Sequence, residues 1–184
     1  MNNFRLTVTL LFLGTLNASA QQEKSVQKEK SDPSKNVSEW LANSKNLKTF
    51  SKAFKVAGEN SGGQNALESG FIPFTIFAPS DSALAKIDKE AKSDEEKIEN
   101  TFLGRKSVSH TGYHIFYGEK LTSKKLMAMA KNKKFLENQV FGGKQQLSEK
   151  EGSIFIGGCK VTQADILCKG GVIHVIDGAL KATR

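Results

Sequence analysis

Apolar positions follow a helical spacing in the first part of the chain. Between residues 38 and 56 they predict two short helices, and they are Trp40, Leu41, Leu47, Phe50, Phe54 and Val56. The glycine-rich stretch from Gly58 to Ile72 breaks this pattern and predicts a long loop. The charged segment from Ser93 to Thr101 predicts a further helix, with Ile98 and Phe102 facing inward.

Strand-like runs begin at Phe74 to Ala78 and return in the C-terminal third of the chain. The later runs are residues 154–156, 160–162 and 172–176. Most helices precede most strands, the two types do not alternate regularly, and no internal repeat is visible. This order predicts an α+β fold, formed by a single domain over residues 38–184, and not a doubly wound parallel sheet.

The N-terminus has the layout of a signal peptide. Arg5 precedes an apolar run from Leu6 to Leu16, and the small residues Ala18-Ser19-Ala20 follow. The run of about eleven residues is too short for a bilayer core, which needs about twenty. We therefore expect removal of residues 1–20 and export to the extracellular space or to the periplasm and cell envelope, with no transmembrane anchor. Residues 21–37 are strongly polar and are predicted to form a flexible leader.

The chain is basic, with a formal net charge of +8 from 27 Lys and Arg against 19 Asp and Glu. In an exported protein this charge favours an acidic polysaccharide over nucleic acid. Lysines are densest around Leu121, Leu126, Met127 and Met129, a pattern typical of a helix with an apolar inner face and a cationic rim. The alternative is an ordinary solvated face. The lysines proposed to bind a polyanion are Lys120, Lys124, Lys125, Lys131, Lys133 and Lys134.

Cys159 and Cys168 are the two cysteines of the sequence. An exported pair favours a disulfide, and closing a loop of about ten residues would stabilise the fold by roughly 2.5–3 kcal/mol. Two separately buried thiols are the alternative, because a bridge requires α-carbons within about 7 Å. His110 and His114 have the spacing of metal ligands on a helix, but Gly112 lies between them and no Glu adjoins them. No metal and no cofactor is expected.

The segment from Thr75 to Ile87 combines a strand end with a helix start. Pro79 cannot continue a strand ladder, and Ser80 or Asp81 can cap the helix that follows. This segment resembles the first signature of fasciclin domains. Three further segments resemble signatures of the same family and follow in the family's order; they are Tyr113-His114 with the strand after it, residues 161–166, and residues 170–180.

The resemblance covers residues 38–182 and implies the fasciclin-type wedge of short β-strands with packed helices. It also implies a hydrogen bond between His114 and Asp81. The signature residues are expected to have a structural and not a catalytic role; they are Thr75, Pro79, Asp81, Tyr113, His114, Asp165, His174 and Asp177.

In function, the resemblance implies a monomeric, non-catalytic module for adhesion or matrix contact that binds an extracellular protein or an acidic polysaccharide. Two alternatives stay open. A carrier of a small apolar ligand would use the loop from residue 58 to 72, and its aromatic residues would be Phe71, Phe74, Phe116 and Tyr117. A secreted hydrolase would need a Ser-His-Asp triad around His174 and Asp177, but the sequence has no G-x-S-x-G elbow.

Overall fold

Helices form most of the first half of the chain and strands most of the second half, in a computed structural model that describes residues 28–61, 64–93 and 96–183. The helices are α1 (Val37–Ala42), α2 (Lys48–Ser61), α3 (Gln64–Ser69), α4 (Asp81–Glu90), α5 (Ile98–Thr101), α6 (Ser107–Gly112) and α7 (Ser123–Lys131). The strands are β1 (Phe74–Pro79), β2 (Ile115–Tyr117), β3 (Phe135–Glu137), β4 (Lys144–Lys150), β5 (Ser153–Ile156), β6 (Cys159–Cys168) and β7 (Gly171–Ile176). This confirms the predicted α+β class.

The strands form one seven-stranded sheet in the order β2-β1-β7-β6-β5-β4-β3. β1 and β7 are parallel, in a register that runs from Phe74 opposite Gly171 to Pro79 opposite Ile176, and the other neighbouring pairs are antiparallel. Every residue of β1 and β7 is buried. Both strands are therefore covered on both faces, which explains their nearly continuous apolar sequences.

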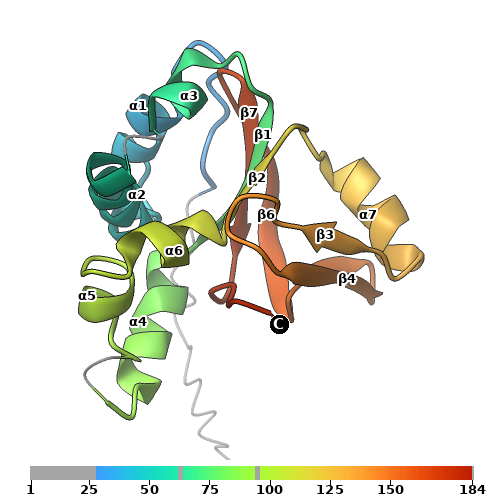
Figure 1. The fold of residues 1–184 in the computed structure, drawn as a ribbon. Helices are drawn as coiled ribbons and strands as arrows, with labels where there is room; N and C mark the ends of the chain where they lie inside the picture. Colours follow the sequence, from blue (N-terminus) through green and yellow to red (C-terminus); the bar gives the residue numbers. More distant parts are fainter. Residues whose placement is uncertain (1–27, 62–63, 94–95, 184) are drawn as a thin grey trace, which may run out of the picture.

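The two faces of β1 belong to two separate hydrophobic cores. Phe74, Ile76 and Ala78 pack in the first core, with side chains from α1, α2 and α4. Phe77 points to the opposite face and packs in the second core, with side chains from α7, β4 and β5. In Figure 1, α1 to α6 accordingly lie on one side of β1 and β7, and α7 lies on the other with β3 and β4.

Two helical predictions need correction. The predicted loop at Gly58 to Ile72 is largely helical, because α2 continues through Gly58 to Ser61 and α3 forms Gln64–Ser69. Burial of Ala57 and Leu67 offsets the cost of about 1 kcal/mol for one helical glycine. Within the described part of the predicted helix at residues 93–101, the α-helical residues are Ile98–Thr101, which form α5. Ile98 and Phe102 are buried as predicted.

Residues 29–36 form an ordered strap along the later part of β6, beyond the residues that pair with β5. Asp32 N donates to Leu167 O at 2.9 Å, Leu167 N donates to the Ser31 hydroxyl at 2.9 Å, and Lys169 N donates to Lys35 O at 2.8 Å. The strap thus pairs backbone groups that an exposed strand edge would leave open. This corrects the prediction of a flexible leader for this part of residues 21–37. The predicted signal peptide and residues 21–27 lie outside the described residues.

Glu29 anchors the strap to the helical layer. Its Oε1 atom accepts hydrogen bonds from the Ser44 hydroxyl at 2.7 Å, Lys45 N at 2.9 Å and Asn46 N at 2.8 Å. The Gln163 side-chain amide brackets the Glu29 backbone, accepting from its N–H at 2.9 Å and donating to its C=O at 2.6 Å. Polar groups hold this segment, so no apolar pattern in the sequence marks it as ordered.

We expect Glu29→Ala to destabilise the domain. The change removes one acceptor from three donors, two of which are backbone N–H groups, and the loss should lower the free energy of unfolding by about 1–3 kcal/mol. Urea titration measures this quantity. Glu99→Ala, which removes an exposed carboxylate on α5, is the control and should have little effect. Equal unfolding of Glu29→Ala and the unaltered protein would show that the strap does not stabilise the fold.

Candidate functional site

Asp81 joins two helices. Ser80 is the N-cap of α4, since its hydroxyl accepts from Ala83 N at 3.1 Å. The Asp81 carboxylate instead turns to the start of α2, where it accepts from Lys48 N at 3.1 Å and Thr49 N at 2.8 Å. A carboxylate suits this place because the first N–H groups of a helix lack partners within the helix and carry partial positive charge.

His114 is fully buried between α6 and β2 and bonds to β1. Its Nδ1–H donates to Phe77 O at 2.7 Å, and the rings of Phe50 and Phe102 lie 5.7 and 5.6 Å from its own. The predicted hydrogen bond to Asp81 is therefore wrong, because backbone groups of other elements engage both side chains. Nε2 has no partner among the described residues. Burial lowers the pKa of His114 to about 4.

His110 and Tyr113 flank His114 at the end of α6. The His110 ring lies 5.7 Å from Phe102 and 6.0 Å from Tyr113, and half-burial followed by the charge of Lys106 lowers the pKa of His110. Tyr113 meets Phe141 edge to face at 6.5 Å. Within the described ranges, no three His, Cys, Asp or Glu side chains are grouped to hold a metal ion.

His174 is a buried residue of β7 that uses both ring nitrogens. Its Nε2–H donates to Leu121 O at 2.8 Å, and its Nδ1 accepts from Asp165 N at 3.3 Å. The ring stacks on Phe77, with 5.3 Å between ring centroids. Burial lowers the pKa of His174, while the Leu121 carbonyl and the Asp165 carboxylate oppose that shift. Because backbone groups occupy both nitrogens, His174 has no free position from which to accept a serine proton.

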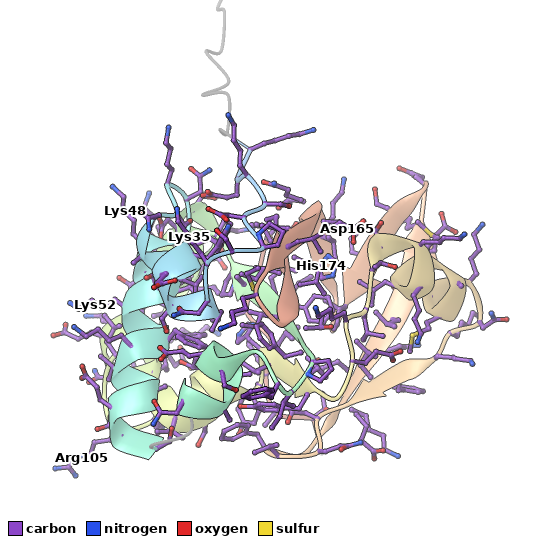
Figure 2. All side chains as sticks on the ribbon, turned by 90° about the horizontal axis from the view of Figure 1, so that it is seen from above. Lys35, Lys48, Lys52, Arg105, Asp165 and His174 are labelled. Atoms are coloured by element: carbon purple, nitrogen blue, oxygen red, sulfur yellow. The ribbon has the colours of Figure 1, made fainter. Side chains whose placement is uncertain are left out.

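Asp165 and Thr75 position the start of α7. Asp165 lies in an irregular part of β6 with φ of 59°, and its carboxylate accepts from Ser123 N at 2.7 Å and from the Ser123 hydroxyl. Figure 2 shows Asp165 and His174 close together on neighbouring strands. The Thr75 hydroxyl donates to Glu119 O at 2.7 Å and accepts from Leu121 N at 2.9 Å. Together with His174, which bonds to Leu121 O, these two signature residues hold the turn that leads into α7.

Pro79 and Asp177 lie at one end of the central strands. Pro79 ends β1 opposite Ile176, the last residue of β7. Asp177 then accepts from Lys160 N at 2.7 Å through its carboxylate and donates its own N–H to Lys160 O at 3.1 Å. Asp177 therefore closes the β6–β7 pairing, away from the ring of His174.

Asn138 is a buried polar residue that no sequence pattern predicted. Its side-chain amide donates to Gly112 O at 2.9 Å and Ile115 O at 3.1 Å, and its carbonyl accepts from Phe141 N at 2.9 Å. This packs Phe141 against α6 so closely that a Cβ on Gly112 would lie 2.3 Å from the ring. A side chain at position 112 would therefore displace the Phe141 ring.

The predicted disulfide is not formed, because Cys159 and Cys168 are free thiols at opposite ends of β6. A strand of this length separates its ends by roughly 25–30 Å, far beyond the limit of about 7 Å for a bridge. Burial raises the pKa of both thiols to about 11. The alternative of two separate thiols is the one observed.

The lysine-rich segment forms a helix with the predicted orientation. Leu121 and Leu126 are buried in the second core, and Met127 and Met129 are partly buried there. The six predicted lysines are exposed: Lys120 precedes α7, Lys124, Lys125 and Lys131 lie on it, and Lys133 and Lys134 follow it. Lys125 forms an ion pair with Glu119. Whether this surface binds a polyanion stays a prediction.

Sequence reasoning missed a second basic surface on α2. Lys48, Lys52 and Lys55 line a groove of about 600 Å³ whose other walls include Leu41 and Phe54. Figure 2 shows Lys48 and Lys52 projecting from the outer side of this layer. Their spacing of four and three residues places them on one helix face, a signal that was visible in the sequence.

A smaller, apolar cavity of about 230 Å³ lies between α2, α6 and residues 140–141, and its walls include Phe54, Ala57, Leu67, Ile115 and Phe141. The Thr111 hydroxyl on this wall is buried without a hydrogen-bond partner among the described residues. Of the aromatic residues predicted to line a pocket, Tyr117 does so, and burial raises its pKa. Phe71 is 91% exposed, while Phe74 and Phe116 are buried in the cores.

The longest helix of the described ranges, α2, has 14 residues. No helix within residues 28–61, 64–93 and 96–183 has both the length and the apolar character needed to cross a bilayer.

Known proteins share both the sequence pattern and the fold of this chain. A family model of the fasciclin domain matches residues 45–182. Human Stabilin-1 is 32% identical over 152 residues, which make up 81% of this chain but 5% of Stabilin-1. The solved FAS1 domain pair of the insect cell adhesion molecule fasciclin I matches with a TM-score of 0.66 over 81% of this chain and 51% of that chain. Its identity of 22% supports similarity of fold alone.

We expect protonation of His114 to destabilise the fold. The pKa of His114 is 6.5 in the unfolded chain and about 4 in the folded protein. The neutral ring therefore contributes fully to the free energy of unfolding above pH 6.5, and this contribution is lost as the pH falls to 4. The difference corresponds to about 3 kcal/mol of unfolding free energy.

The test compares the free energy of unfolding near neutral pH with that at about pH 4, in the unaltered protein and in a variant without the His114 ring. All other titrating groups are the same in both proteins, so a difference between them reports on His114. His114→Gln keeps a side-chain N–H for Phe77 O but does not titrate. Its stability should fall less than that of the unaltered protein. The same decrease in both proteins would contradict the assignment to His114.

Proposed function

Because the chain belongs to the fasciclin domain family, we propose that it is an exported adhesion module whose basic surface around α7 binds an acidic extracellular polysaccharide. The family is associated with cell adhesion, and the fold is that of a FAS1 domain from an adhesion molecule. The buried histidines bond to backbone carbonyls, which supports a structural role for them.

The observation that carries the proposal is a row of exposed lysines on a firmly held helix. Lys124 and Lys131 lie on α7 and Lys134 follows it, and none of the three has an ion-pair partner within the described residues. The helix itself is fixed, because Leu126 is fully buried and Asp165 caps its start. Lysines on a fixed helix lose less backbone freedom on binding than lysines on a mobile loop.

The expected binding is electrostatic. Three exposed ion pairs at about 0.5 kcal/mol each correspond to roughly a tenfold change in affinity. At high salt the Debye length falls to about 3 Å, so most of this attraction should disappear.

Neutralising three lysines of the surface around α7 tests the proposal. We expect Lys124→Gln with Lys131→Gln and Lys134→Gln to weaken binding to immobilised heparin about tenfold at low salt, with no difference at about 1 M salt. The matched control replaces Lys86, Lys89 and Lys92 in and after α4, and it should bind normally. A third variant replaces Lys48, Lys52 and Lys55. Loss of binding in this variant alone would assign the function to α2 and contradict the α7 proposal.

The apolar cavity favours a second candidate function, carriage of a small ligand. Its volume of about 230 Å³ exceeds that of an engineered cavity of about 150 Å³ that binds benzene. The buried Thr111 hydroxyl supplies one hydrogen-bonding group in an otherwise mostly apolar wall. Together they suit a compact aromatic molecule with one polar atom.

Indole is a suitable probe for this second candidate. We expect it to bind in a titration followed by NMR, with severalfold weaker binding to Thr111→Val, which keeps the shape of the side chain and removes the hydroxyl. Ala57→Met, which fills part of the cavity, should abolish binding in protein that still unfolds cooperatively. Equal shifts in all three proteins would exclude the cavity as the indole site.

A further inference from the structure

Phe71 is the most exposed large apolar side chain among the described residues. It is 91% exposed, and its neighbour Ile72 is 43% exposed. The two belong to the tip, defined here as residues 70–73, which connects α3 to β1 at the upper end of the molecule in Figure 1, opposite the C-terminus. The proposed polysaccharide surface does not use either residue.

Backbone contacts hold the base of the tip. Pro73 O accepts from Gly118 N at 2.7 Å, and Phe74 N donates to Gly170 O at 3.4 Å. Gly70 and Gly170 pack backbone against backbone, since a Cβ on Gly170 would lie 2.4 Å from Gly70 Cα. Phe71 therefore projects from a turn whose base is held by backbone contacts.

One lysine lies against the tip, and two more belong to segments next to it. Lys169 lies beside it, because a Cβ on Gly70 would be 3.0 Å from Lys169 Cγ. Lys35 is next to Lys169, because its backbone carbonyl accepts a hydrogen bond from Lys169 N. Lys120 comes two residues after Gly118, whose N–H bonds to Pro73 in the tip.

Two acidic groups at this end form ion pairs, and a third, Glu68 on α3, accepts a hydrogen bond from the Ser38 hydroxyl. Asp32 forms an ion pair with Lys35 at 3.3 Å, and Glu119 forms one with Lys125. Lys120 and Lys169 have no acidic partner among the residues that the structure describes. The tip therefore combines a protruding apolar pair with two lysines, Lys120 and Lys169, that form no ion pair within the described residues.

We propose that the tip binds the surface of an anionic lipid bilayer, with Phe71 and Ile72 entering the boundary between headgroups and acyl chains. Lys169 and Lys120 would then lie at the level of the negatively charged headgroups. An acidic polysaccharide would match the charge but offers no apolar phase for Phe71. This is why the combination favours lipid at this end of the molecule.

Vesicle binding tests the proposal. We expect the purified protein to co-sediment with vesicles of phosphatidylcholine and phosphatidylglycerol and to bind phosphatidylcholine vesicles much more weakly. Phe71→Ala should weaken binding to the anionic vesicles about tenfold or more, because it removes most of the inserted apolar surface. Phe135→Ala is the matched control, since Phe135 is 55% exposed on β3, and it should bind as the unaltered protein does.

The charge contribution is tested with Lys169→Gln, because Lys120 also belongs to the proposed polysaccharide surface. Lys169→Gln should weaken binding to anionic vesicles severalfold, and Lys89→Gln on α4 should not. Phe71→Ala should keep full binding to heparin, so failure of this proposal can be distinguished from failure of the polysaccharide proposal.

A fluorescent variant reports on insertion directly. In Phe71→Trp the introduced indole should shift its emission to shorter wavelength on anionic vesicles and be quenched by brominated acyl chains, whereas Trp40 is buried and should change little. Three results would each overturn the proposal. They are undiminished vesicle binding by Phe71→Ala, absence of vesicle binding at low salt, and an introduced indole whose emission on the vesicle stays at the wavelength seen in water.

Discussion

The parallel pairing of β1 with β7 determines the rest of the structure. Both strands are buried on both faces, so each side chain along them must find a place in one of two cores. Apolar residues do this by packing, but Thr75 and His174 bring polar atoms into the same strands. Each is accommodated by hydrogen bonds to backbone groups of the turn before α7. An unmet polar atom there would cost more than the bond itself contributes.

The signature residues act together as joints between elements. Asp81 binds the start of α2, His114 binds β1, and Asp165 binds the start of α7. Each of these bonds joins a side chain of one element to a backbone group of another. The contact between the two elements therefore does not depend on the identity of the solvent-exposed side chains. The surface is therefore free to differ between proteins with the same framework, and both proposed binding functions use surface features, α7 and the tip.

Much of this framework could be predicted from local sequence, and the joints could not. β1 was recognisable because its apolar run ends at Pro79, and α7 because its lysines and apolar residues separate onto two faces. The partner of His114 depends on which backbone carbonyl tertiary packing brings near, which no local pattern encodes. The same holds for Cys159 and Cys168, for which the expected export favoured a disulfide although an extended strand holds them apart.

The strap along β6 gives the domain an asymmetric response to mechanical force. Tension applied to the chain before residue 28 reaches the domain through Glu29 and the edge contacts of Asp32 and Lys35, and not through the central strands. Detachment of the strap would release several residues as extended chain while the side chains of both hydrophobic cores stay packed.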